Sequence, residues 1–153
     1  MKSLLEYIPM DRVRRIDTNR REEILKALIA TALPDEPESL HARILGDITS
    51  FSRKKEVDMG NGFFLVHTRT AEVPDISISV GLLPDLIKYR RGESAHTVLC
   101  IIVPDSMSRT YLSLMARLAR FLSQPETGDV FRSRDPQAVY ELILQFETPS
   151  QGA

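Results

Sequence analysis

The sequence predicts an α/β fold, in which a mixed β-sheet is flanked by α-helices. The chain has 153 residues, the length of one domain with an ordinary core. Helical and strand-like periodicities interleave along the sequence, and three runs have the pattern of strands, which a helix bundle would lack. We therefore expect a single domain over residues 1–153, with a disordered tail from about residue 147 onward.

The N-terminal part predicts one short strand and two helices. Residues 12–17 have the pattern of a short strand. A helix follows, for which Thr18 or Asn19 is the expected N-cap and Pro34 the stop. A second helix is expected over residues 36–48. Apolar residues recur at helical spacing in both segments: Ile24, Leu25, Leu28 and Ile29 in the first, and Leu40, Ile44, Leu45 and Ile48 in the second.

A charged loop over residues 52–58 is expected to lead into three strands. The first, residues 62–67, is apolar and ends in a histidine. In the second, residues 75–83, apolar residues alternate with serines, which predicts a half-buried strand. The third, residues 96–104, is a continuous apolar run typical of a buried central strand.

Two helices complete the predicted fold. The clearer one covers residues 108–124, and its expected apolar side consists of Leu112, Met115, Leu118, Ala119 and Leu122. The last covers residues 135–146, with Asp135 as N-cap and Pro136 at the first helical position.

Composition excludes several classes of function. The formal net charge of -1 argues against nucleic acid as a main partner, since binding phosphates requires an excess of Lys and Arg. Cys100 is the single cysteine, which fits a reducing compartment. No signal-peptide pattern is present, and the apolar runs are far shorter than the roughly 20 residues that span a bilayer. These features predict a soluble, cytoplasmic protein that is not inserted into a membrane.

The motif search leaves histidine chemistry or none. The sequence lacks HExxH, CxxC, GxSxG and the phosphate-binding glycine motifs, so we expect no bound metal or cofactor. Of the three histidines, His41 is interpreted as a surface residue and His96 as a structural one. His67 ends an apolar strand, where α/β proteins tend to place their sites, and Arg69 follows it. The residues alone leave open whether His67 is a site or only a strand end.

Several motifs occur in an order that resembles that of a known protein family. A helix containing "ARIL" is followed by "GNGFFLVHTR", "ISISVGLL", "TVLCIIVP" and "TYLSLMARLARFL". From about Leu4 to Phe146 this order resembles the type-2 enzyme IIA family of the phosphoenolpyruvate-dependent sugar phosphotransferase system. That family includes fructose- and mannitol-type domains and a nitrogen-regulatory relative, and its corresponding strand reads roughly "GNGIAIPHAR".

The resemblance implies a phosphocarrier in which His67 accepts a phosphoryl group. The donor would be a histidine-containing phosphocarrier protein, and the recipient a sugar-permease domain or a regulatory target that responds to phosphorylation. Arg69 would stabilise the phosphoryl group. The chain departs from the family pattern at Val66, where proline is usual, and at Tyr111, where a second active-site histidine is usual. The family's arginine after the "IL" helix has no clear counterpart, and Arg53 is a possible replacement.

Three readings stay open at this point. The chain is a divergent phosphocarrier that uses His67, Arg69, Tyr111 and Arg53, or a catalytically degenerate module that binds a partner protein without phosphoryl transfer, or the resemblance is accidental. The sequence is silent on the sugar, on transport versus regulation, and on the oligomeric state.

Overall fold

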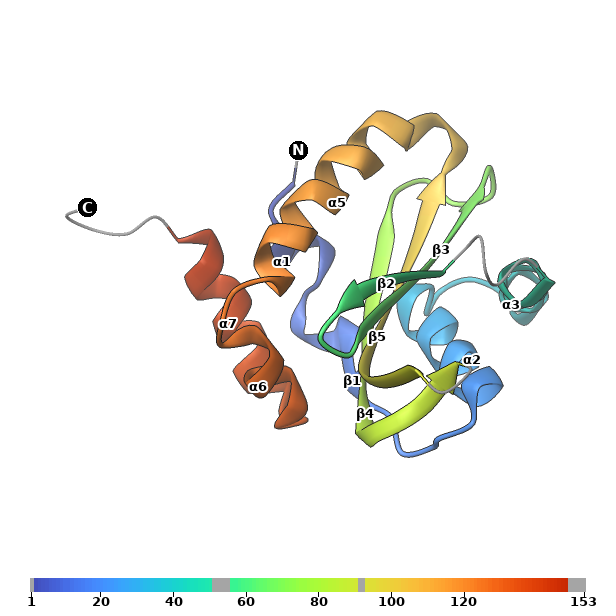
Figure 1. The fold of residues 1–153 in the computed structure, drawn as a ribbon. Helices are drawn as coiled ribbons and strands as arrows, with labels where there is room; N and C mark the ends of the chain where they lie inside the picture. The colour runs from blue at the N-terminus through green and yellow to red at the C-terminus, as the bar shows by residue number, and fades with distance from the viewer. Residues whose placement is uncertain (1, 51–55, 91–92, 149–153) are drawn as a thin grey trace.

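The computed structural model describes residues 2–50, 56–90 and 93–148, and it confirms the predicted α/β class with a mixed sheet (Figure 1). The sheet has five strands in the order β1-β4-β5-β3-β2. β1 is parallel to β4 and β3 is parallel to β5, whereas the β4–β5 and β2–β3 pairs are antiparallel. The strands are β1 (Val13–Arg15), β2 (Glu56–Gly60), β3 (Phe63–Thr70), β4 (Ser77–Arg90) and β5 (Glu93–Pro104).

Helices cover both faces of the sheet, so the fold has three layers (Figure 1). On one face lie α2 (Arg21–Ala32) and α3 (Glu38–Ser50). On the other lie α1 (Leu4–Tyr7), α5 (Ser108–Leu122), α6 (Thr127–Arg132) and α7 (Pro136–Glu147). Two 3₁₀ turns, η1 (Met10–Arg12) and η2 (Asp105–Met107), precede β1 and α5. The sheet separates two apolar cores, and β3 contributes Phe63 and Leu65 to the α5 side and Phe64 and Val66 to the α2 side.

Three elements were absent from the sequence-based expectation. The helices α1 and α6 are short, and β2 includes Glu56–Asp58, which the sequence placed in a charged loop. Glu56 is tolerated inside a strand because its fully buried side chain forms an ion pair with Arg21 of α2. Pairing with β3, which is not local in sequence, therefore makes this charged segment a strand.

The expected half-buried character of the second strand was wrong. Ser79 is fully buried in β4, and its hydroxyl donates a hydrogen bond of 2.6 Å to the carbonyl oxygen of Leu28 in α2. At Gly81 a Cβ atom would lie 3.0 Å from the Leu28 side chain. The small residues of β4 thus face α2 at close range, and β4 is covered on both sides.

Two helix details also differ from the expectation. Arg20 occupies the N-cap position of α2 without a side-chain cap. The hydroxyl of Thr18 donates to Glu23 and accepts from the backbone N–H of Arg20.

In α5 the buried face differs from the expected one, since Leu112 is 66% exposed and Ala119 is also exposed. The residues that it buries are Tyr111, Leu114, Leu118, Phe121 and Leu122. Asp135 caps α7 as predicted, accepting from the N–H of Gln137. Of the expected tail, residues 149–153 lie outside the described residues.

Candidate functional site

His67 is half-buried in β3 on the face of the sheet that α5 covers. Side chains alternate along a strand, so His67 follows Phe63 and Leu65 on the α5 side, whereas Thr68 points to the α2–α3 side. The sequence had suggested that His67 ends the strand. In the structure the strand continues to Thr70, so His67 lies within β3. The preceding apolar residues are fully buried on either face and hold the backbone at His67 in place.

The parallel pairing of β3 with β5 brings Tyr111 to His67. His67 lies opposite Ile101 in this register, and the chain then passes through η2 at the same edge of the sheet into α5. Tyr111 lies in the first turns of α5, where its ring centroid is 5.6 Å from that of His67, with the planes inclined by 36°. Two residues 44 positions apart in the sequence thus form one ring pair.

The Tyr111 ring is buried, and its hydroxyl has no hydrogen-bond partner among the residues that the structure describes. The residue is 8% exposed, and its hydroxyl forms no hydrogen bond with any described residue. Burial raises the pKa of Tyr111 above its ordinary value of 10.0, against the opposing effect of the Arg69 charge. The phenol is therefore protonated at neutral pH, and it can donate a hydrogen bond to an anion placed near His67.

Arg69 lies two residues beyond His67 on the same face of β3. It is exposed, and within the described ranges it has neither an ion pair nor a hydrogen bond. Its charge acts on Tyr111, where it opposes part of the rise in pKa that burial causes. An unpaired guanidinium beside a half-buried imidazole is suited to an anionic group on the imidazole. Arg53, the fourth site residue named from the sequence, lies outside the described residues.

The N-terminus of α5 contributes to the same region. The first backbone N–H groups of a helix have no partner within it and carry a partial positive charge. Met107 is the N-cap of α5 and supplies no side-chain cap. The site thus combines an imidazole, a protonated phenol, a guanidinium and a helix N-terminus. It could hold a phosphoryl-sized anion on His67 without a metal. No cluster of three or more possible metal-ligating side chains occurs among the residues that the structure describes.

His96 is structural, as its sequence position suggested. Its Nε2–H donates to the carbonyl oxygen of Asn61 over 2.8 Å, and its Nδ1 lies 2.7 Å from the hydroxyl of Thr97. The carbonyl can only accept, so Nε2 carries the proton and Nδ1 accepts from Thr97. His96 therefore fastens the Gly60–Gly62 turn between β2 and β3, at the opposite end of β3 from Thr70.

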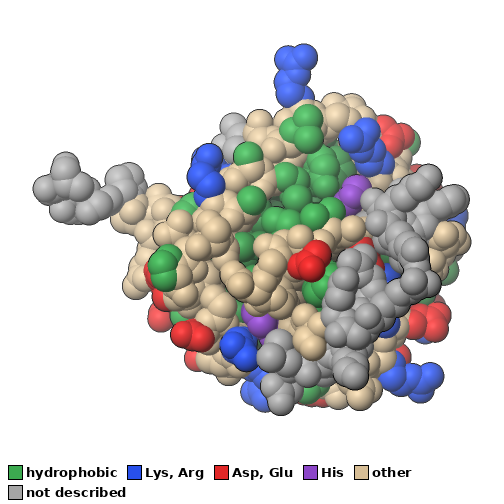
Figure 2. All heavy atoms as spheres, viewed as in Figure 1, with side chains coloured by type: hydrophobic (Ala, Val, Ile, Leu, Met, Phe, Trp, Pro, Cys, Tyr) green, Lys and Arg blue, Asp and Glu red, His purple; other side chains and the backbone are tan. Residues whose placement is uncertain are grey.

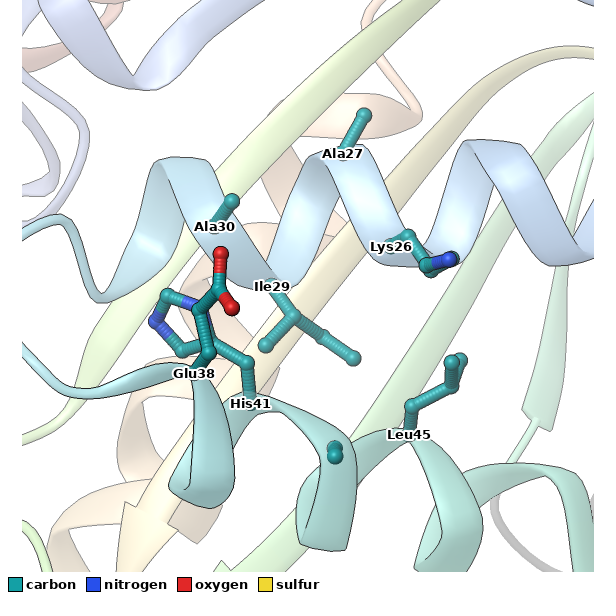
Figure 3. A pocket seen from close by; sticks show the side chains of 8 residues that line it. Lys26, Ala27, Ile29, Ala30, Glu38, His41 and Leu45 are labelled. Atoms are coloured by element: carbon teal, nitrogen blue, oxygen red, sulfur yellow. The ribbon is translucent and has the colours of Figure 1, made fainter.

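His41 is half-buried, so its interpretation as a surface residue was wrong. Its Nε2 is 2.7 Å from the carbonyl oxygen of Leu33, which holds the ring between α2 and α3. The ring lines a groove of about 590 Å³ between these helices, with Lys26 and Ile29 on one wall and Leu45 on the other (Figure 3). None of His67, Arg69 and Tyr111 lines this groove.

One interaction behind His67 was not predicted from the sequence. The buried hydroxyl of Thr68 donates a hydrogen bond to the carboxylate of Asp47 in α3. In the sequence, Asp47 is one polar residue on an amphipathic helix, and only the packing of α3 against β3 gives it a partner. Thr68 carried a weak signal, as a hydroxyl residue within an otherwise apolar strand.

Apolar side chains are visible on the surface beside α5 (Figure 2). Figure 2 shows hydrophobic side chains gathered in a hollow between α5 and β2, with a histidine side chain at the edge. Leu112, the most exposed large hydrophobic residue that the structure describes, follows Tyr111 on α5. Contiguous exposed apolar surface of this kind is typical of protein-binding regions.

Comparisons with known proteins agree with the fold. Residues 7–146 match the family model for the phosphoenolpyruvate-dependent sugar phosphotransferase system, EIIA 2. A search of curated proteins finds no match.

Three solved structures illustrate the similarity of the fold. The nitrogen regulatory protein IIA-Ntr from Neisseria meningitidis has a TM-score of 0.77 at 16% identity, covering 92% of this chain and 98% of that one. A putative PTS IIA (PtxA) from Streptococcus mutans has a TM-score of 0.72 at 13% identity, covering 96% of each chain. The mannitol-specific cryptic phosphotransferase enzyme IIA CmtB from Escherichia coli has a TM-score of 0.67 at 14% identity, covering 94% of this chain and 99% of that one.

Proposed function

This chain belongs to the EIIA type 2 family of the phosphoenolpyruvate-dependent sugar phosphotransferase system, and from that premise we propose that it is a phosphohistidine carrier whose acceptor is His67. The observation that supports this most is the ring pair of His67 and Tyr111, with Arg69, which pairs with none of the described residues, on the same face of the strand. This arrangement offers a nucleophile together with two donors for an anion.

The proposed reaction moves a phosphoryl group between two imidazoles. A ring nitrogen of neutral His67 attacks the phosphorus atom of a phosphohistidine on the donor. The new P–N bond forms as the donor's P–N bond breaks. His67 then releases the proton of its second ring nitrogen, and the donor takes up one proton and leaves as neutral imidazole, so the proton count is unchanged. Phosphoryl transfer is chiefly a matter of positioning and charge stabilisation. Arg69 and the N-terminus of α5 stabilise the negative charge, and the Tyr111 hydroxyl donates to a phosphoryl oxygen.

The proposed partners are those that the family implies. A histidine-containing phosphocarrier protein supplies the group, and a sugar-permease domain takes it on or a regulatory target responds to it. Proteins of both kinds share the fold, since one is a nitrogen regulatory protein and another is a mannitol-specific enzyme IIA. The proposal places the chain in the cytoplasm. None of the helices that the structure describes is long and apolar enough to cross a membrane.

The alternative function is a degenerate module that binds a partner without phosphoryl transfer. The observation that favours it is Tyr111 in the place where the family usually has its second active-site histidine. A phenol can donate a hydrogen bond, but it cannot become a cation near neutral pH. In this alternative, the apolar surface beside α5 binds the partner and His67 carries no phosphoryl group.

Intact mass separates the two functions. The protein is incubated with phosphoenolpyruvate, enzyme I and the phosphocarrier protein, beside an enzyme IIA that is known to accept. The carrier function predicts a mass gain of one acid-labile phosphoryl group in the wild type and in His41→Gln, and no gain in His67→Gln. An unlabelled wild type, in a reaction that labels the known acceptor, would exclude the carrier. Labelling that persists in His67→Gln would exclude His67 as the site.

A further inference from the structure

We propose that Thr68 and Asp47 are a positioning pair that fixes the end of β3 to α3 and so keeps His67 facing Tyr111. The effect of this pair on phosphoryl transfer rests on the proposed function of His67. Its effect on the orientation of the ring does not, and can be measured separately.

The first observation is that β5 is the described partner of β3 along the segment that carries His67. The described ladder between β2 and β3 begins at Glu56, which lies opposite Val66. From His67 to Thr70 the described partner of β3 is β5 alone, along the other edge. This register places His67 opposite Ile101 and Thr68 opposite Ile102.

The second observation is that a cavity and a polar contact lie together behind this segment. A cavity of about 100 Å³ lies between α3 and the end of β3, and its lining includes Asp47, Thr68 and Arg69. Leu40 and Ile44 of α3 complete the apolar part of this lining and also belong to the core on the α2 side of the sheet. Atoms beside a cavity make fewer van der Waals contacts than atoms in a packed core. A hydrogen bond there therefore contributes a larger share of what restrains the backbone.

The third observation is that α3 holds the end of β3 at two points. Thr68, 1% exposed, donates its hydroxyl proton to the Asp47 carboxylate. Arg43, four residues before Asp47 and on the same side of the helix, forms an ion pair with Glu72, just after β3. A hydrogen bond to a charged group that is shielded from water is stronger than an exposed ion pair, so Thr68 and Asp47 are the main tie.

The consequence for His67 follows from strand geometry. Neighbouring side chains on a strand point to opposite faces, so fixing Thr68 toward α3 fixes His67 toward α5. A twist of the backbone at Thr68 would turn the imidazole away from Tyr111. Because phosphoryl transfer depends on in-line positioning, a small misplacement lowers the rate without changing the nucleophile.

Thr68→Val tests the pair, because valine keeps the shape of the side chain and removes its hydroxyl. We expect the maximal rate of labelling to fall about tenfold, with an unchanged KM for the phosphocarrier protein and full final labelling. Thr68→Ser restores the hydroxyl and should bring the rate back to within about twofold of the wild type. Thr49→Val is the matched control, since Thr49 lies on α3 and its hydroxyl donates only within the helix, to Leu45 and Gly46.

Nuclear magnetic resonance of the unphosphorylated protein gives a second readout. In Thr68→Val the ring resonances of His67 should move toward those of an unfolded chain, while Thr68→Ser and Thr49→Val should keep the wild-type values. Wild-type rate and wild-type His67 resonances in Thr68→Val would overturn the proposal. The proposal would also be overturned if Thr68→Val reached a lower final extent of labelling while its labelled molecules reacted at the wild-type rate. That result would mean only that a fraction of the protein is unfolded. A wild type that accepts no phosphoryl group refutes the proposed function, and the resonances then decide the positioning role alone.

Discussion

Replacing Gly62 with alanine should destabilise the protein by two separable effects. Gly62 has a φ of 88°, a backbone conformation in which a Cβ atom is strained by about 1–2 kcal/mol. That atom would also lie 2.5 Å from Cδ2 and 3.1 Å from Nε2 of His96. The ring would have to move, with the loss of its hydrogen bonds to Asn61 and Thr97.

The magnitude follows from these contacts. Two hydrogen bonds contribute about 1 kcal/mol each, so the free energy of unfolding should fall by about 3.5 kcal/mol in total. For a chain of this length that corresponds to a fall in Tm of roughly 7 to 14 °C. Urea denaturation followed by circular dichroism measures the free-energy change, and a thermal scan measures Tm.

Two other glycines separate strain from the clash. Gly60 has the same φ of 88°, but a Cβ atom there would meet nothing within 4 Å, so Gly60→Ala should show the strain of about 1–2 kcal/mol alone. Gly46 lies within α3 with open space around it, and Gly46→Ala should stabilise the helix by up to about 1 kcal/mol. Equal losses for Gly62→Ala and Gly60→Ala would refute the reasoning, because His96 would then not restrict the turn.

Three further predictions concern single side chains. Tyr111→Phe should slow labelling of His67 about tenfold, the effect of one lost donor to a charged group, with an unchanged urea midpoint because the hydroxyl bonds to none of the described residues. Labelling at the wild-type rate would show that the hydroxyl does not contact the phosphoryl group. Burial holds the pKa of His96 below its ordinary value of 6.5, so the unfolded chain takes up this proton first. The stability that neutral His96 provides should be complete above about pH 6.5 and be lost as the pH falls toward the pKa of the folded state. In His96→Gln the urea midpoint should therefore fall less with decreasing pH than it does in the wild type. Burial also raises the pKa of Cys100 to about 12, so Ellman's reagent should label this thiol in concentrated urea but not in the native protein at mildly alkaline pH; rapid labelling of the native protein would contradict its burial.

Local patterns in the sequence were sufficient for most of the fold. The helices α2, α3, α5 and α7 and the strands β3 and β5 follow from apolar periodicity and capping signals that each segment carries itself. The structural role of His96 also followed from its place at the start of a buried strand. The resemblance to the enzyme IIA family rests on the same local motifs, and the match to the family model confirms it.

Those local patterns do not predict contacts between segments that are distant in the sequence. The charged start of β2 becomes a strand only when β3 pairs with it and Arg21 neutralises Glu56. The apolar face of α5 was misplaced because its sequence offers overlapping stripes of apolar residues. Docking on the sheet buries the stripe that contains Tyr111 and leaves Leu112 exposed.

The sequence by itself determined that His67 lies on an apolar strand, whereas the continuation of that strand to Thr70, which puts Arg69 on the same face as His67, came from the structure. It also determined the order of elements that relates this chain to its family. Only the tertiary structure decided what surrounds His67. Parallel pairing of β3 and β5 places Tyr111 against the imidazole, and packing of α3 joins Asp47 to Thr68 behind it. The physical reason is that burial of the two apolar faces of the sheet selects how the helices dock, and no local pattern encodes that choice.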